Sequence, residues 1–226
     1  MKYVIRFKKT GVICFTSHLD IMKVFKRSFK RAGIKLAFSQ GFNPHPKMGF
    51  AQPLSLGYKG YDEYMEFETA AEDCDVKGEE MLETLRVLMP EGLTLVSIHE
   101  APELRKTLAS MTIAAEYEIR IPLCLPLHED AKELWKKYMG QETITALKKQ
   151  KKKRESVIVD IKPKIRKLSF NPRNDCLVID AVLDAGSESN LSPELLIDTA
   201  IRTLGIECDR AEISVSRLKL QFRQPI

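Results

Sequence analysis

The sequence has no cysteine motif. Its five cysteines are scattered singly, without a C-x-x-C pair or a box of cysteines and histidines. An odd number of separated cysteines does not form a disulfide framework, and no local motif is present that would hold zinc or an iron–sulfur cluster. We therefore expect unpaired cysteines that are mostly buried, no cofactor and no metal.

Long apolar runs are also missing. No stretch approaches 18 uninterrupted apolar residues, and the first residues alternate charged and apolar side chains, unlike the apolar segment of a signal peptide. With 44% hydrophobic residues, the 226-residue chain can bury one full core or two small ones. We expect a soluble, cytoplasmic protein with no membrane partner.

The motifs of several large enzyme classes are absent. The sequence contains no G-x-x-x-x-G-K-[ST], no G-x-G-x-x-G that opens a helix, no H-E-x-x-H and no G-x-S-x-G. These absences disfavour P-loop nucleotide hydrolysis, Rossmann redox chemistry and serine hydrolysis. We expect that the chain is not an enzyme by itself.

Long stretches of the chain lack charge of one sign. Residues 1–61 contain 12 Lys or Arg and one acid, residues 62–104 contain 13 acids and two basic residues, and residues 148–173 contain 11 basic residues and two acids. Two basic blocks favour a polyanionic partner such as RNA. The alternative is that the acidic block packs against a basic block and neutralises it.

Hydrophobic periodicity predicts an α+β fold with two tandem ferredoxin-like domains and antiparallel sheets. Residues 2–8 alternate as a strand, Ser17 and Asp20 match a capping box, and the helix that follows ends at Gly33. The elements expected next are strands at 36–39, 48–56 and 63–69, a helix at 78–88 and a strand at 93–99. This is the β-α-β-β-α-β order of a ferredoxin-like domain.

The same order is expected again from residue 115. The predicted elements are a first strand, a helix at 129–139, strands at 156–161 and 175–183, a helix between Ser192 and Gly205, and a strand at 213–222. The apolar phase of the last strand slips between Val215 and Leu218, which indicates a β-bulge. We place an N-terminal domain at 1–108 and a C-terminal domain at 109–226.

Two clusters of cations are candidate RNA-binding surfaces. The first helix carries a basic face, and no acid between residues 21 and 60 is available to pair with it. A phosphate backbone would explain this face, which consists of Lys23, Lys26, Arg27, Lys30 and Arg31. The second cluster is a dense run expected in a loop, formed by Lys148, Lys149, Lys151, Lys152, Lys153 and Arg154.

The stretch GFNPHPKMGF at residues 41–50 fixes a histidine, His45, between two prolines. In a catalytic interpretation, His18 and His45 supply a general base and a general acid for metal-independent RNA cleavage, and Lys47 stabilises the developing charge. Asp20 is a further catalytic candidate beside His18. A metal site is a weaker interpretation, because His18, Asp20 and His45 provide only three ligands at nonstandard spacing.

Binding and structural interpretations of the same stretch stay open. In the binding interpretation, the prolines hold a preorganised pocket whose residues are Ser17, Phe42, Asn43, Pro44 and Pro46. In the structural interpretation, Ser17 and Asp20 cap a helix and His45 packs in a stiff turn. Three aromatic residues nearby are either core residues or stacking platforms for single-stranded bases, namely Phe38, Phe42 and Phe50.

Several stretches together resemble a bacterial family of unknown function, the radical-SAM-linked proteins. The stretches are FTSHLD, SFKRAGI, FSQGFNPHPKMGFAQPLSLG and DEYMEF, and the resemblance spans roughly residues 1–220. It implies a partnership with a radical S-adenosylmethionine protein that has a cobalamin-binding region, and it maps the family signature onto residues 17–20 and 41–46. The tandem layout is also similar, in fold only, to CRISPR RNA-processing endonucleases.

Three hypotheses for function follow. The first is a non-enzymatic accessory module that binds RNA, such as ribosomal or transfer RNA, and presents it to the radical SAM partner. The second is a metal-independent endoribonuclease that uses His18 and His45. The third is a scaffold that docks the same partner through the acidic block of residues 62–104 and binds no RNA.

Overall fold

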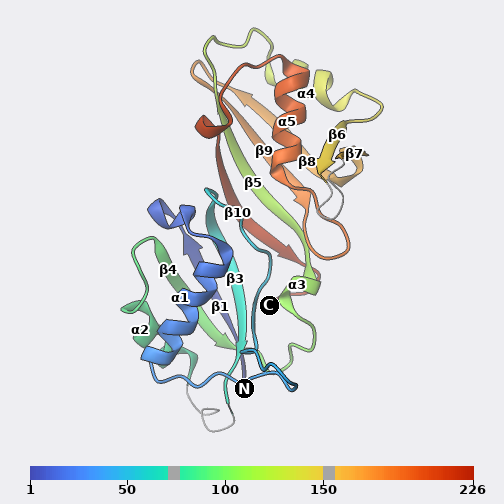
Figure 1. The fold of residues 1–226 in the computed structure, drawn as a ribbon. Helices are drawn as coiled ribbons and strands as arrows, with labels where there is room; N and C mark the ends of the chain where they lie inside the picture. Colours follow the sequence, from blue (N-terminus) through green and yellow to red (C-terminus); the bar gives the residue numbers. More distant parts are fainter. Residues whose placement is uncertain (71–76, 150–155) are drawn as a thin grey trace. The chain divides into compact units, whose positions relative to one another are not determined.

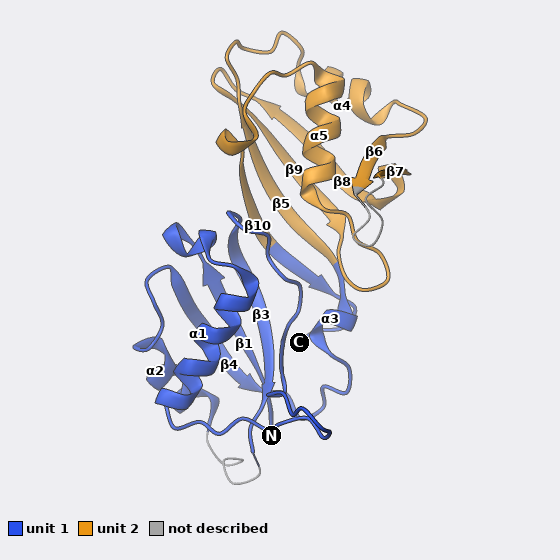
Figure 2. Ribbon diagram, in the orientation of Figure 1, with its two compact units in different colours: residues 1–113, 219–226 blue, residues 114–218 orange. Residues whose placement is uncertain are grey.

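The computed structural model describes residues 1–70, 77–149 and 156–226 and has the predicted α+β class (Figure 1). The chain divides into two compact units, of which unit 1 comprises residues 1–113 and 219–226 and unit 2 comprises residues 114–218 (Figure 2). The predicted domain boundary lies at the start of a short helix, α3 (Leu108–Met111). Among the described residues, no helix has the length and apolar character needed to cross a membrane.

Unit 1 contains the predicted succession of elements. They are β1 (Lys2–Lys9), α1 (His18–Arg31), β2 (Met48–Phe50), β3 (Lys59–Glu68), α2 (Gly78–Arg86) and β4 (Leu93–Glu100). A 3₁₀ helix, η1 (Gly11–Phe15), connects β1 to α1. Strand β1 pairs antiparallel with β3 and β4, and β2 pairs antiparallel with β3, which gives the order β4-β1-β3-β2.

The connection between α1 and β3 is less regular than the sequence predicts. Residues 36–39 form only two isolated bridges, Leu36 with Thr69 and Phe38 with Pro46, and only residues 48–50 of the predicted 48–56 form a strand. Bridges leave most of this connection outside the sheet. The loop that contains His45 therefore projects from a narrow base.

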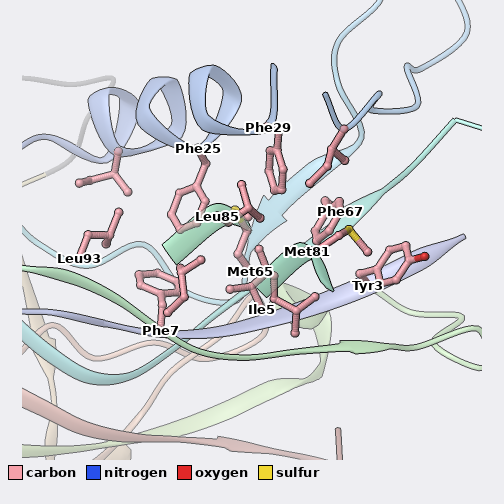
Figure 3. Packing of buried hydrophobic residues seen from close by; sticks show 14 of the residues in the cluster. Tyr3, Ile5, Phe7, Phe25, Phe29, Met65, Phe67, Met81, Leu85 and Leu93 are labelled. Atoms are coloured by element: carbon pink, nitrogen blue, oxygen red, sulfur yellow. The ribbon is translucent and has the colours of Figure 1, made fainter. Parts of the chain in front are cut away.

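The core of unit 1 lies between one face of the sheet and the helices α1 and α2 (Figures 1 and 3). Odd-numbered residues of β1 and β3 face this core, as the period of two predicts. Burial of one large apolar side chain contributes about 1.5–3 kcal/mol, so the cluster is the main source of stability for unit 1. Its labelled members are Tyr3, Ile5, Phe7, Phe25, Phe29, Met65, Phe67, Met81, Leu85 and Leu93.

Unit 2 has the same kinds of element as unit 1, with a two-stranded sheet in addition. They are β5 (Thr112–Pro122), α4 (Ala131–Met139), β6 (Thr145–Lys149), β7 (Ser156–Asp160), β8 (Ile165–Pro172), β9 (Cys176–Asp184), α5 (Pro193–Leu204) and β10 (Ser214–Phe222), whose last residues belong to unit 1. Strand β9 pairs antiparallel with β5 and with β8. Strands β6 and β7 pair with each other and, within the described residues, form a separate two-stranded sheet.

The sequence pattern finds some elements of unit 2 and misses others. Helix α5 has the predicted Ser192 cap, and Gly205 follows it in the left-handed conformation with φ 69°. The predicted strand at 156–161 is β7, which does not join the main sheet. The strand beside β9 is β8, which the pattern misses because its register shifts between Ile165 and Lys167 and breaks the apolar alternation.

Candidate functional site

Helix α1 begins with the cap that the sequence predicts. The Ser17 hydroxyl accepts a hydrogen bond from the Asp20 amide at 3.2 Å and donates one to the Asp20 carboxylate at 2.7 Å. Lys23 donates to the same carboxylate at 2.9 Å, and the bonds from Lys23 and Ser17 lower the pKa of Asp20. Asp20 is thus ionised and forms part of the helix cap. Lys23 belongs to the predicted basic face, and the expectation that this face has no acidic partner is wrong for Lys23.

His18 packs against the core at this end of the helix. Its ring meets Phe50 edge-on, with the ring centroids 5.0 Å apart. Burial, and secondarily the charge of Lys9, lower the pKa of His18, so the imidazole is neutral at pH 7. Together with Lys9 and Glu63, His18 lines a cavity of about 20 Å³, which has room for a single water molecule.

Two charged neighbours of His18 were not among the site residues predicted from the sequence. Lys9 and Glu63 are each 3% exposed, and the Lys9 ammonium donates to the Thr16 carbonyl at 2.9 Å. Lys9 continues the core-facing odd positions of β1, and Glu63 does the same in β3. A charged residue at a core-facing position of each strand is the signal that could have found them.

His45 closes an exposed loop. The Ser39 amide donates to the His45 carbonyl at 2.8 Å, and the His45 amide donates to the Ser39 hydroxyl at 3.0 Å. The bridge between Phe38 and Pro46 lies directly next to this pair. Three predicted pocket residues are exposed on the loop, namely Phe42, Asn43 and Pro44.

The two candidate catalytic histidines have different surroundings. His45 is exposed, whereas His18 lies against Phe50, and in the described part of the chain the two share no hydrogen bond or ring contact. Ser17 is also far from the loop pocket. It caps the N-terminal end of the 14-residue helix α1, which is about 21 Å long, whereas Pro46 lies with Lys30 and Gly33 at the C-terminal end. The structure therefore does not gather the predicted site residues at one point.

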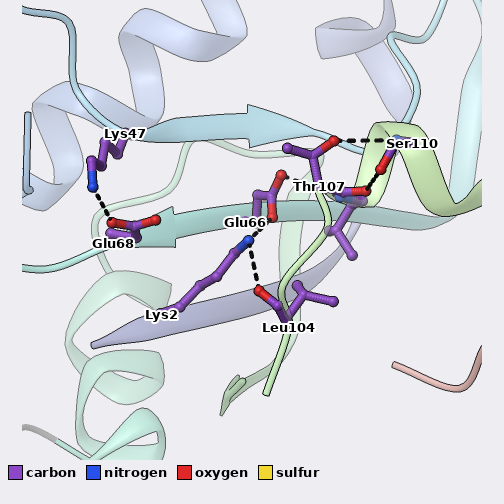
Figure 4. Close-up of polar contacts among 8 residues, drawn as sticks. Lys2, Lys47, Glu66, Glu68, Leu104, Thr107 and Ser110 are labelled. Carbon is purple, nitrogen blue, oxygen red and sulfur yellow. Dashed lines mark hydrogen bonds and ion pairs between the residues drawn. The ribbon is translucent and has the colours of Figure 1, made fainter. Parts of the chain in front are cut away.

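Acids of β3 neutralise part of the N-terminal basic block. Lys47 pairs with Glu68 at 2.7 Å, and Lys2 pairs with Glu66 at 2.7 Å and also donates to the Leu104 carbonyl (Figure 4). Arg6 pairs in the same way with Asp62. Lys47 is thus engaged by a carboxylate.

Four cations of α1 form no ion pair with any described residue: Lys26, Arg27, Lys30 and Arg31. Two pairs of them lie four residues apart on the helix, where like charges cost roughly 0.2–0.5 kcal/mol per pair. Only Lys30 and Arg31, which lie in the last turn, are stabilised by the helix dipole. The row therefore does not stabilise the helix by itself and is available to an anionic ligand.

The C-terminal end of α1 has a defined stop. Gly33 adopts φ 75°, its amide donates to the Lys30 carbonyl, and the Ile34 amide donates to the Phe29 carbonyl. These two bonds form a Schellman motif, which requires the left-handed conformation that glycine adopts without strain. The motif turns the chain so that Ile34 follows the helix directly.

An open groove of about 510 Å³, here called the α1 groove, lies at this end of the helix. Most of the residues that line it are apolar, and three are lysines. The apolar residues are Phe29, Ile34, Leu36, Phe38 and Pro46, and the lysines are Lys26, Lys30 and Lys35. Of the residues that line it, Lys26, Lys30, Phe38 and Pro46 were candidates from the sequence. Lys35 and the apolar lining contributed by Phe29, Ile34 and Leu36 were not.

A cluster of exposed apolar side chains lies at the opposite end of α1. It comes from η1, the first turn of α1 and the loop before β3, which is joined to η1 by a 2.9 Å bond from the Gly57 amide to the Cys14 carbonyl. The exposed fractions range from 62% to 88%. This apolar cluster consists of Val12, Phe15, Leu19 and Leu56.

Little of the second predicted cation cluster can be placed. Lys148 is exposed on β6, Lys149 belongs to the same strand, and residues 151–154 lie outside the described residues. Leu147 and Ile158 face each other across β6 and β7 and are both exposed. Within the described ranges, no group of three or more His, Cys, Asp or Glu side chains could hold a metal ion.

The chain matches the model of one protein family over most of its length. The model of a family described as an uncharacterized protein conserved in bacteria (DUF2344) matches residues 2–193, and the chain belongs to this family. No curated protein matches the chain. The matched range includes all of α1, the His45 loop, the α1 groove and the apolar cluster.

Proposed function

We propose that this protein is an accessory module that binds RNA at the C-terminal end of α1 and presents it to a radical SAM partner. The observation that carries the proposal is the row of four cations on α1 that have no acidic partner among the described residues, next to the α1 groove. Cations that replace the counterions of a phosphate backbone supply most of the affinity of nonspecific nucleic-acid binding.

The partner half of the proposal has a separate support. Clustered exposed apolar side chains are typical of protein interaction sites, and the apolar cluster lies at the other end of α1 from the α1 groove. RNA and a partner protein could therefore bind at the same time. That the partner is a radical SAM protein rests on the sequence resemblance alone.

We also propose that both units are ferredoxin-like domains. The strand order β4-β1-β3-β2 of unit 1 agrees with this fold. In unit 2, β8, β9, β5 and β10 follow one another in the corresponding order, with β6 and β7 inserted after the first helix. Fold alone does not assign the activity, because this architecture hosts many functions.

The alternatives have less support from the described residues. Cleavage of RNA needs an acid and a base within hydrogen-bond reach of one phosphate, about 2.6–3.2 Å. His18 is packed against Phe50, and Lys47 is paired with Glu68. For a scaffold that binds no RNA, the acidic block is a weaker docking surface, since four of its acids already pair within unit 1.

Charge reversal tests RNA binding. We expect the triple variant K26E/R27E/K30E to bind a labelled transfer RNA at least about 100-fold more weakly at physiological ionic strength, and to lower the slope of log K against log salt by about 2 to 3. Fluorescence anisotropy at several salt concentrations measures both quantities. The same samples, analysed on a denaturing gel, show whether the RNA is cut.

A matched control makes the same change in net charge on unit 2. K132E/K136E/K167E replaces three exposed lysines that form no ion pair with the described residues, and its affinity should stay within about threefold of wild type. Equal losses in the two variants would show that net charge alone governs binding. No RNA binding by the wild-type protein would overturn the proposal, and cut RNA ends would favour the nuclease.

A further inference from the structure

We infer that the α1 groove accepts unpaired bases, so that the RNA ligand is single-stranded and not a duplex. This inference rests on the proposed function and deepens it. Three features of the described residues support it: the mixed lining of the groove, two exposed aromatic rings and the closed base of the loop that carries one of them.

The lining of the α1 groove matches the two halves of a nucleotide. Lys26 and Lys30 line the groove and lie on one side of the helix, four residues apart. Its interior is apolar, with Ile34 and Leu36 among its residues. A ligand that offers only phosphates would gain nothing from apolar walls, whereas an unpaired nucleotide presents a flat base together with its phosphate.

A duplex cannot use such a groove. In A-form RNA the bases are stacked inside the helix, and the accessible surface consists of phosphates, 2′-hydroxyls and base edges in a shallow minor groove. Proteins that read RNA through its bases therefore bind single strands, loops or bulges, where bases can leave the stack. The apolar interior of the α1 groove is accessible only to this class of RNA.

One phenylalanine of the groove and one on the loop between the groove residues Phe38 and Pro46 are exposed in the way that stacking requires. Phe38 lines the groove and is 52% exposed, and Phe42 on the His45 loop is fully exposed. An aromatic ring on which a base stacks contributes about 1–3 kcal/mol per base. Phe38 can stack on a base inside the groove, and Phe42 on its neighbour in the same strand.

The base of the loop that carries Phe42 is closed by hydrogen bonds before any ligand arrives. Ser39 and His45 are joined by two hydrogen bonds, the Lys47 amide donates to the Ala37 carbonyl at 2.8 Å, and Phe38 forms a bridge with Pro46. The backbone around the groove residues Phe38 and Pro46 is thus held in place in the free protein, and preorganisation of this kind raises affinity. The base of the loop acts as a wall of the site that is present before a base binds.

The test compares three forms of one RNA. A labelled single strand of about ten nucleotides, the duplex of the same length and an abasic strand with the same phosphates are titrated with the full chain by fluorescence anisotropy. We expect the single strand to bind at least about tenfold more tightly than the other two. Since all three carry phosphates, K26E/R27E/K30E should weaken all of them.

A single substitution isolates base stacking. F38A should lower affinity for the single strand by about 5- to 100-fold, leave duplex and abasic binding unchanged and keep the salt slope, because no phosphate contact is lost. The control is F15A, which removes an exposed ring from the apolar cluster at the other end of α1 and should leave affinity unchanged. F42A adds a variant at a fully exposed position that does not affect folding, with a several-fold loss expected.

The outcomes separate the inference from the proposed function. Equal affinity for the three RNA forms, or equal effects of F38A and F15A, would overturn base insertion while a strong effect of the triple charge variant would retain RNA binding. If none of the three forms binds, both proposals fail. Thermal unfolding of F38A checks that its loss of affinity does not come from unfolding.

Discussion

The N-terminal end of helix α1 holds its charges in pairs, whereas the C-terminal end leaves them without acidic partners among the described residues. At the first end, Asp20 is bonded to Ser17 and Lys23, and the buried Lys9 donates to a carbonyl. The cavity there has room for one water molecule. At the second end, four cations form no ion pair with a described residue, and two of them, Lys26 and Lys30, line a groove of about 510 Å³.

This difference does not come from the composition of the helix, since both ends carry cations. It comes from where carboxylates approach it: Glu63 lies in the cavity beside His18, whereas none of the described acids pairs with the cations at the C-terminal end. A buried charge without a partner costs several kcal/mol, so the paired end is required for folding. An exposed cation without a partner costs little stability, so it is available to bind a ligand.

Removal of the buried ammonium should have the largest effect on stability. We expect K9M to lower the free energy of unfolding by about 2–3 kcal/mol, because it leaves the Thr16 carbonyl without its donor and Glu63 in a cavity without a cation. Urea unfolding measures this loss. The control K30M, at an exposed position, should change stability by less than about 0.5 kcal/mol and weaken RNA binding instead. A larger effect of K9M on RNA affinity than on stability would contradict the division between the two ends.

Substitution of the glycine at the helix stop should have an intermediate effect. G33A and G205A both place alanine in a left-handed conformation, at φ 75° and φ 69°, where a Cβ atom meets no heavy atom within 4 Å. Each should lower stability by about 1–2 kcal/mol through backbone strain alone. Only G33A should also weaken RNA binding, because Gly33 and Ile34 line the α1 groove. Thermal unfolding and anisotropy give the two values, and equal losses of RNA affinity would disconnect the groove from binding.

The smallest effect concerns pH. The pKa of His18 is lowered in the folded state, chiefly by burial, so the unfolded chain binds a proton first as the pH falls. The contribution of His18 to stability is complete above a pH of about 6.5 and is lost as the pH falls through the lower folded-state pKa. H18Q should therefore show a flatter fall in the urea midpoint between pH 7 and pH 5, with unchanged RNA affinity at pH 7. His99, whose pKa is also lowered by burial, provides the matched variant H99Q with the same sign. A midpoint that falls equally in wild type and H18Q would show that the ring titrates as it does in the unfolded chain.

Local signals in the sequence predict the helices well. Ser17 and Gly33 mark the limits of α1, and Ser192 and Gly205 mark those of α5, because caps and stops depend on bonds within a few residues. The common face of the α1 cations is predictable for the same reason, since it follows from helical spacing.

Contacts between distant segments are not predictable in the same way. The pairing of Lys47 with Glu68, the pairing of β7 with β6 and the position of β8 depend on which strands meet and in which register. The apolar lining of the α1 groove is missed because Phe29 and Leu36 come from the helix and from the segment that folds back beside it. Periodicity assigns a residue to a face but not to its neighbour on another strand.

The main chain of His45 closes its loop, whereas its side chain does not. The amide and carbonyl of His45 bind Ser39, and any residue other than proline could supply them. The exposed imidazole takes no part in holding the loop. The ring between the two prolines is therefore interchangeable as far as architecture is concerned, and an alanine in its place changes the chemistry of the loop while its shape is kept.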